Sequence, residues 1–140
     1  MALASVGGGY QNTDGNLSEL TLGTQAAPQT ATATATLTVT QTLGGLLVGD
    51  PTTTAATYTL PTATAIDAVM TNMKTNSTFT LRVINIGTST GLITMAVGTG
   101  ITAVGNLVVA ITGSAAGVGG AAEFLFRKTG TAAYSVYRVA

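Results

Sequence analysis

The side chains best suited to acid–base chemistry in this 140-residue chain are five carboxylates, and they are widely scattered. They are Asp14, Glu19, Asp50, Asp67 and Glu123. Catalysis by paired carboxylates needs two of them close together, with one in a pocket that desolvates it. We expect these five to lie in an arm, a turn, a helix and a strand, and no motif links them. A small hydrolase that uses Asp67 or Glu123 is therefore the last of the functions we consider.

Composition excludes several other kinds of site. The chain has no His and no Cys, so it has no imidazole base, thiolate nucleophile or disulfide, and no His or Cys ligand for structural zinc. Its Gly-rich stretches precede no expected helix and lack the Gly-Lys-Ser/Thr that cradles phosphate. We predict no catalytic residue, cofactor or metal ligand, no small-molecule substrate, and no enzymatic activity.

The basic residues also argue against a nucleic-acid partner. The five Lys and Arg are balanced by five Asp and Glu, so the net charge is zero. Basic residues interleaved with aromatic ones can mark single-strand binding, and such a pattern involves Arg82, Arg127, Lys128 and Arg138 beside Phe126 and Tyr137. Without a second basic cluster, we interpret these four cations as outward-facing strand positions.

The low charge does suggest a protein partner. Charged residues are 7% of the chain, and 29 Thr, 22 Ala and 18 Gly supply about half of it. A surface so poor in charge is typical of one that other subunits cover. No segment reaches the roughly 18 apolar residues of a membrane helix, and the start lacks the features of a signal peptide. We therefore expect no membrane partner, and synthesis in a cytoplasm.

The elements that must position these residues are mostly strands. Residues 1–29 are rich in Gly, Asn, Gln and Ser and predict an extended N-terminal arm. From Thr30 to Thr42 every even position is Thr, and this period of two predicts one half-buried strand with all its hydroxyls on one face. Such a strand is also an edge to which another chain's strand could pair.

After Pro61 the period becomes helical, which predicts the only helix at Ala65–Lys74, with Thr62 or Thr64 as N-cap and Lys74 in the last turn. Further strands are predicted around 43–48, 58–60, 78–86, 92–97, 101–104 and 107–111, then a Gly/Ala loop at 113–120. A four-residue loop, 129–132, joins the last two strands, 121–128 and 133–139. The predicted fold is all-β: a single-domain antiparallel β-sandwich or barrel of seven or eight strands (30–140), with one short helix and the arm.

The order of short motifs along the chain resembles a family of small β-rich virion proteins of tailed bacteriophages. The motifs are Val6–Gly9, Asp14-Gly15-Asn16, Leu22–Pro28, the Thr/Ala strand, Tyr58–Thr62, Phe79–Asn85, Ala96–Gly100, Phe126–Gly130 and Tyr134–Arg138. The resemblance implies a capsid decoration or cement protein, which bridges neighbouring major capsid subunits on the outer surface of the virion and is made in the host bacterial cytoplasm. It also implies a homotrimer, by analogy with compact decoration proteins.

The interface residues that we predict lie in the arm and on the Thr-rich strand. They are Val6, Gly8, Tyr10, Leu17, Leu20, Leu22, Thr34, Thr36 and Thr38. The alternative function is a trimeric tail- or fibre-associated β-domain for host attachment, which would be present in only a few symmetric sets per particle.

Overall fold

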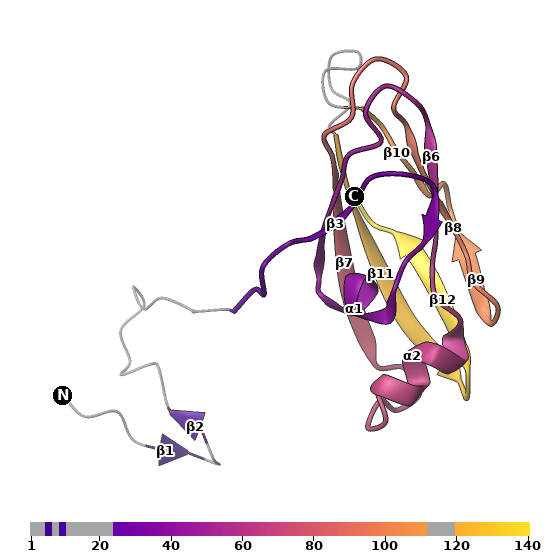
Figure 1. Ribbon diagram of the computed structural model, residues 1–140. Helices are drawn as coiled ribbons and strands as arrows, with labels where there is room; N and C mark the ends of the chain where they lie inside the picture. Colours follow the sequence, from indigo (N-terminus) through magenta and orange to yellow (C-terminus); the bar gives the residue numbers. More distant parts are fainter. Residues whose placement is uncertain (1–4, 7–8, 11–23, 112–119) are drawn as a thin grey trace.

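The computed structural model describes residues 5–6, 9–10, 24–111 and 120–140, which form two large β-sheets and a small one (Figure 1). The six-stranded sheet has the order β3 (Gln29–Ala31), β5 (Leu46–Gly49), β7 (Thr78–Asn85), β11 (Ala121–Gly130), β12 (Ala133–Arg138), β9 (Ile101–Val104). The four-stranded sheet has the order β10 (Val108–Val109), β8 (Ile93–Ala96), β6 (Ala56–Thr59), β4 (Ala35–Thr36). The small sheet pairs β1 (Ser5–Val6) with β2 (Gly9–Tyr10).

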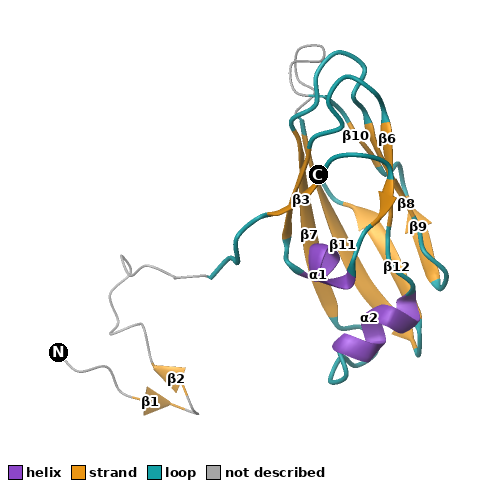
Figure 2. Cartoon of the chain, in the orientation of Figure 1, coloured by secondary structure: helices purple, strands orange, loops and turns teal. Residues whose placement is uncertain are grey.

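The strand-rich fold is confirmed, but its sheets are mixed rather than antiparallel. From β3 to β11 the chain crosses to the opposite sheet at every connection (Figures 1 and 2). In the first part of the chain, successive strands of one sheet run parallel, as β3–β5–β7 and β4–β6–β8 do, whereas β10 pairs antiparallel with β8 and β11 pairs antiparallel with β7. Parallel neighbours need a crossover connection, which here includes a strand of the other sheet. Neither large sheet closes into a barrel within the described residues, because each keeps two edge strands.

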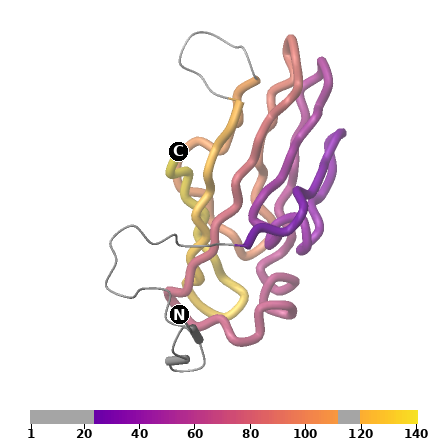
Figure 3. Tube along the Cα trace, turned by 90° about the vertical axis from the view of Figure 1, so that its left-hand side faces the viewer, coloured from indigo at the N-terminus to yellow at the C-terminus, as the bar shows by residue number. Residues whose placement is uncertain are grey.

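One apolar core lies between the two large sheets. In the turned view of Figure 3, the yellow C-terminal strands and the indigo segment that begins at residue 24 lie toward opposite sides of the body. Phe126 of β11 stacks on Phe79 of β7, with ring centroids 4.6 Å apart. From the other sheet, the fully buried Tyr58 donates a hydrogen bond to the Ala31 carbonyl at 2.8 Å. Gly49 permits the close approach of the sheets, because a Cβ there would lie only 2.4 Å from Cδ1 of Ile93.

The Thr-rich segment does not form the single strand predicted for Thr30–Thr42. The chain leaves the six-stranded sheet after Ala31, bends, and joins the four-stranded sheet as the two-residue β4. It then forms α1 (Val39–Leu43), whose N-cap Thr38 shares reciprocal hydrogen bonds with Gln41. Threonine hydroxyls serve turns and helix caps as well as strands, and the alternation did not distinguish these uses.

The second helix differs in extent from its prediction. α2 spans Ala63–Val69, and its N-cap is Thr62, as predicted, whose Oγ1 accepts the Ala65 N–H at 3.2 Å. The helix ends at Met70, so Lys74 lies beyond it and not in its last turn. With α1 present as well, the prediction of one helix over Ala65–Lys74 was wrong in number and length.

The later strands agree better with the sequence. In β7 the buried Leu81 and Val83 alternate with the exposed Arg82 and Ile84, as predicted. Strands β8, β9 and β10 lie within the predicted ranges, and residues 113–119 of the predicted loop lie outside the described residues. The β11–β12 loop has two residues rather than four, since Gly130 pairs with Ala133 after a bulge.

Candidate functional surface

The predicted arm interface falls largely outside the described residues. Gly8, Leu17, Leu20 and Leu22 all lie there. Val6 and Tyr10 belong to the short strands β1 and β2, which pair antiparallel in the registers Ser5–Tyr10 and Val6–Gly9. The arm interface therefore remains a prediction.

The predicted threonine interface is not a single face. Thr34 lies at the bend, where its Oγ1 accepts the Thr57 N–H at 3.0 Å. Thr36 lies in β4 and pairs with Thr59 of β6. Thr38 is the N-cap of α1. All three are exposed, but each belongs to a different local structure, so the prediction of a continuous hydroxyl row was wrong.

A different surface stands out: the side of the six-stranded sheet that points away from the core. We call it the outer face. Register and burial together place two kinds of residue on it. The apolar ones form two rows across the strands, Val48–Ile84–Ala121 and Leu125–Tyr137–Val104, with Leu46 between them, and the exposed fraction is 37% for Ile84 and 44% for Val104. The polar ones are Thr30, Thr78, Thr80, Arg82, Thr102, Glu123, Arg127 and Ser135. No described element covers this face.

The centre of the outer face carries one ion pair and a shallow hollow. Arg82 Nε lies 2.8 Å from Glu123 Oε2, across the β7–β11 pairing. The hollow has a volume of about 310 Å³ and is lined by Leu46, Arg82, Val83, Ile84, Ala121, Ala122, Glu123 and Ala140. A broad face with two apolar rows and a central ion pair fits a protein partner better than it fits a small polar substrate.

The outer face could have been recognised from one sequence signal. Apolar residues occupy both the even and the odd positions of the run Ala121-Ala122-Glu123-Phe124-Leu125-Phe126, and therefore both sides of the strand. A strand that is apolar on both sides is normally covered on both sides. Phe124 and Phe126 fill the core, and Leu125 between them points outward. The sequence analysis predicted this strand but did not use its two-sided apolar pattern, and so it missed the second apolar face.

A second cluster, around Asp67, lies where α2 meets the β11–β12 hairpin. Asp67 Oδ1 accepts hydrogen bonds from Lys128 Nζ at 2.7 Å and from Tyr134 Oη at 2.5 Å, and its Oδ2 accepts the Ala132 N–H at 2.8 Å. These bonds, led by the one from Lys128, lower the pKa of Asp67 from 3.8 to about 2. Burial and the neighbouring carboxylate raise the pKa of Tyr134.

The Asp67 cluster is a structural tie rather than a paired-carboxylate site. Glu123 is the other acid that we considered for a hydrolase, and it points to the opposite side of the sheet, toward Arg82. Asp50 accepts the Thr52 N–H at 3.0 Å in a turn, and Asp14 and Glu19 lie outside the described residues. In the part of the chain that is described, no group of three or more acidic, His or Cys side chains could hold a metal ion.

Two of the four predicted outward cations in fact point inward. Lys128 lies on the core side of β11 and binds Asp67, with 12% of its side chain exposed. Arg138 lies on the core side of β12, where Nη1 donates to the Val108 carbonyl of the opposite sheet at 2.5 Å. Arg82 and Arg127 do point outward, and Arg127 binds the side-chain oxygen of Asn76 at 2.9 Å. A cation on the core side of a strand can therefore be accommodated near the end of the strand, where an oxygen of another element binds it.

Comparisons of the chain with protein-family models, with curated proteins and with solved structures found no match. Over the described residues, neither helix has the length and apolar character needed to cross a membrane.

Proposed function

We propose that this protein is a structural virion protein that decorates the capsid of a tailed bacteriophage and cements neighbouring major capsid subunits. The observation that carries the proposal is the outer face, where exposed Ile84 and Val104 lie with Leu125 and Tyr137 on one sheet surface. Burying such a face against a partner releases water from apolar surface, at roughly 25 cal/mol per Å². This binding needs no catalytic residue.

The virion assignment itself comes from the motif order described above, and the outer face supplies the binding mode. We interpret the two mixed sheets as a modified β-sandwich that presents its outer face to a shell. We also propose a homotrimer on that shell, by analogy with compact decoration proteins, and a trimer is one of the closed symmetries that homo-oligomers adopt. Its test is the mass of the free protein in sedimentation equilibrium, and a monomer at all concentrations would contradict the trimer.

The first experiment counts copies of the protein in purified virions against the major capsid protein, by quantitative mass spectrometry. We expect a simple ratio to the capsid protein, because a cement covers the whole shell. A few symmetric sets per particle would instead support the tail- or fibre-associated alternative. Absence from the virion would contradict both.

The second experiment tests the outer face directly. Ile84→Glu places a charge in the contact, where desolvation makes it costly, and we expect loss of binding to capsids that lack the protein. The matched control is Val97→Glu, because Val97 lies outside the six-stranded sheet and is 38% exposed, against 37% for Ile84. Equal binding by the two folded variants would show that the outer face is not the contact.

A further inference from the structure

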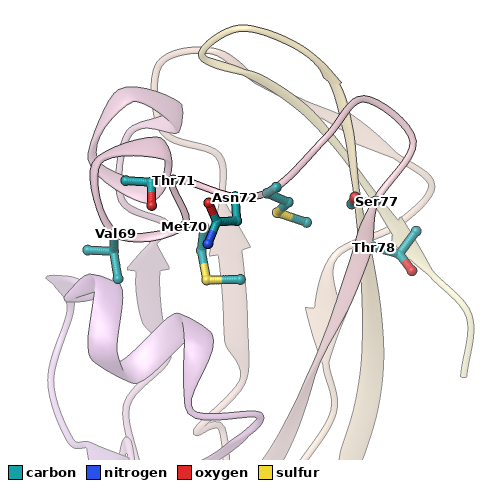
Figure 4. Close-up of a pocket in the computed structure, with 7 residues that line it drawn as sticks. Val69, Met70, Thr71, Asn72, Ser77 and Thr78 are labelled. Carbon is teal, nitrogen blue, oxygen red and sulfur yellow. The ribbon is translucent and has the colours of Figure 1, made fainter. Parts of the chain in front are cut away.

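A second apolar surface lies between the two helices and is separate from the outer face. α1 and α2 are in contact, and Val69 at the end of α2 is 60% exposed. Val69 lines two hollows. One has a volume of about 280 Å³ and is also lined by Val39, Thr40, Leu43 and Gly44. The other has a volume of about 400 Å³ and is also lined by Met70, Thr71, Asn72, Met73, Ser77 and Thr78 (Figure 4). We call the two hollows together the helix groove.

The helix groove is apolar where it is deepest and uncharged throughout. Leu43, Met70 and Met73 line it and also pack against the core, so its floor is continuous with the interior of the protein. Figure 4 shows the Met70 side chain directed between the end of α2 and the Ser77–Thr78 segment. None of its lining residues carries a charge. The groove thus suits an uncharged aliphatic segment, and methionines adapt to such ligands.

The described part of the chain contacts the groove close in sequence to an apolar segment. The Gln25 side chain donates a hydrogen bond to the Gly44 carbonyl at 2.6 Å, and Gly44 lines the groove. Gln25 therefore contacts the groove's rim two residues after residues 11–23, which lie outside the described part of the chain. Leu22 stands three residues before Gln25, which bounds its distance from Gln25 to about 11 Å even in a fully extended chain. Leu20 and Leu22 would share one side of an extended segment.

We infer that the helix groove binds the Leu17–Leu22 segment of the same chain, with Leu20 and Leu22 against Val69 and its neighbours. This docking fixes the root of the N-terminal arm to the body, and leaves residues 1–16 to reach a partner. Exposed apolar groups on both sides of the contact would be removed from water. The inference does not depend on the virion proposal, since it concerns the free protein in solution.

The test uses the absence of native cysteine, which makes any introduced thiol the only one. Val69→Cys is conservative and lies at an exposed position, so the variant should fold. In the full-length chain we expect its thiol to react with a maleimide several-fold more slowly than after Leu20→Ser and Leu22→Ser are added. The control is Val97→Cys, whose rate should not change with the leucines. An equal rate at Val69→Cys with and without the leucines would overturn the inference.

A cross-link identifies the chain that supplies the segment. We expect Leu22→Cys combined with Val69→Cys to form a disulfide within the monomer, at a yield independent of protein concentration. The pair Leu22→Cys with Val97→Cys should give little product under the same oxidant. Cross-linking only between two copies, with a yield that falls on dilution, would contradict docking within one chain and indicate exchange of the segment between copies.

Discussion

Each side of β11 and β12 carries residues that are unusual for its position in the sheet. On the core side, both strands carry a cation toward one end, Lys128 and Arg138, and each cation binds an oxygen of its own chain. On the outer side, Leu125 and Tyr137 are apolar, and no described segment covers them. The fold itself supplies a hydrogen-bond partner for each inward cation. It leaves the outward apolar side chains uncovered by any described segment. We therefore regard the inward cations as residues needed for folding, and the outward apolar residues as available to a partner.

The largest loss of stability should come from replacing Phe126, and Leu125, its neighbour on the opposite side of β11, provides the comparison. Phe126 is fully buried and stacks on Phe79, so Phe126→Ala should lower the free energy of unfolding by about 3–5 kcal/mol. Leu125→Ala on the outer side should cost about 1 kcal/mol in the free protein, because the leucine is only half-buried. Urea unfolding monitored by circular dichroism measures both. Similar losses would mean that the outer face is as much part of the core as the inner one.

The next largest loss of stability should come from removing the charge of Asp67. Asp67→Asn removes the charge that holds Lys128 and Tyr134, and should cost about 2 kcal/mol of stability, the range for hydrogen bonds to charged groups. Glu123→Gln on the outer face is the matched control. The Arg82 side chain is 65% exposed and that of Glu123 34%, and such exposed pairs contribute little. A loss for Glu123→Gln equal to that for Asp67→Asn would contradict the distinction between the two sides.

Low pH should weaken the contacts of Asp67 with Lys128 and Tyr134. The pKa of Asp67 is lowered in the folded protein to about 2 from 3.8, so between these values the unfolded chain binds more protons than the folded one. The stabilisation from this group is therefore complete above about pH 4 and is lost as the pH falls toward 2. Thermal unfolding at pH 5 and pH 2.5 measures the loss, which should be smaller in Asp67→Asn. An identical pH dependence in the variant would mean that Asp67 does not contribute.

How far the sequence predicts these features depends on how local they are. In β7 the alternation of Leu81 and Val83 with Arg82 and Ile84 is decided within the strand, and it was predicted correctly. In the Thr-rich segment the alternation is equally regular, but contacts from elsewhere in the chain decide the structure. Tyr58 and Thr57 hold the bend at Ala31 and Thr34, and these partners are 27 and 23 residues away.

The candidate surfaces depend even more on distant residues. Asp67 meets Lys128 across 61 positions, and no spacing rule connects an acid on a helix with a cation on a strand so far away. The charge of Lys128 predicts an outward side chain, because burying an unpaired cation on the core side costs free energy. The pairing with Asp67 removes that cost, and the sequence did not show the pairing. The outer face likewise required the strand order, which places Ile84 beside Ala121 and Leu125 beside Tyr137. Only the two-sided apolar character of β11 was visible in the sequence.

The smallest effect belongs to the ion pair at the centre of the outer face. A double-mutant cycle with Arg82→Gln and Glu123→Gln should give a coupling energy of about 0.5 kcal/mol in the free protein, decreasing as salt is added. If a partner covers the outer face, the same pair loses its contact with water, and removal of one member alone then leaves an unpaired buried charge. Each single variant should therefore weaken partner binding more than the double variant does. Equal effects of the single and double variants on binding would place the pair outside the contact, and would restrict the interface to the apolar rows on either side of it.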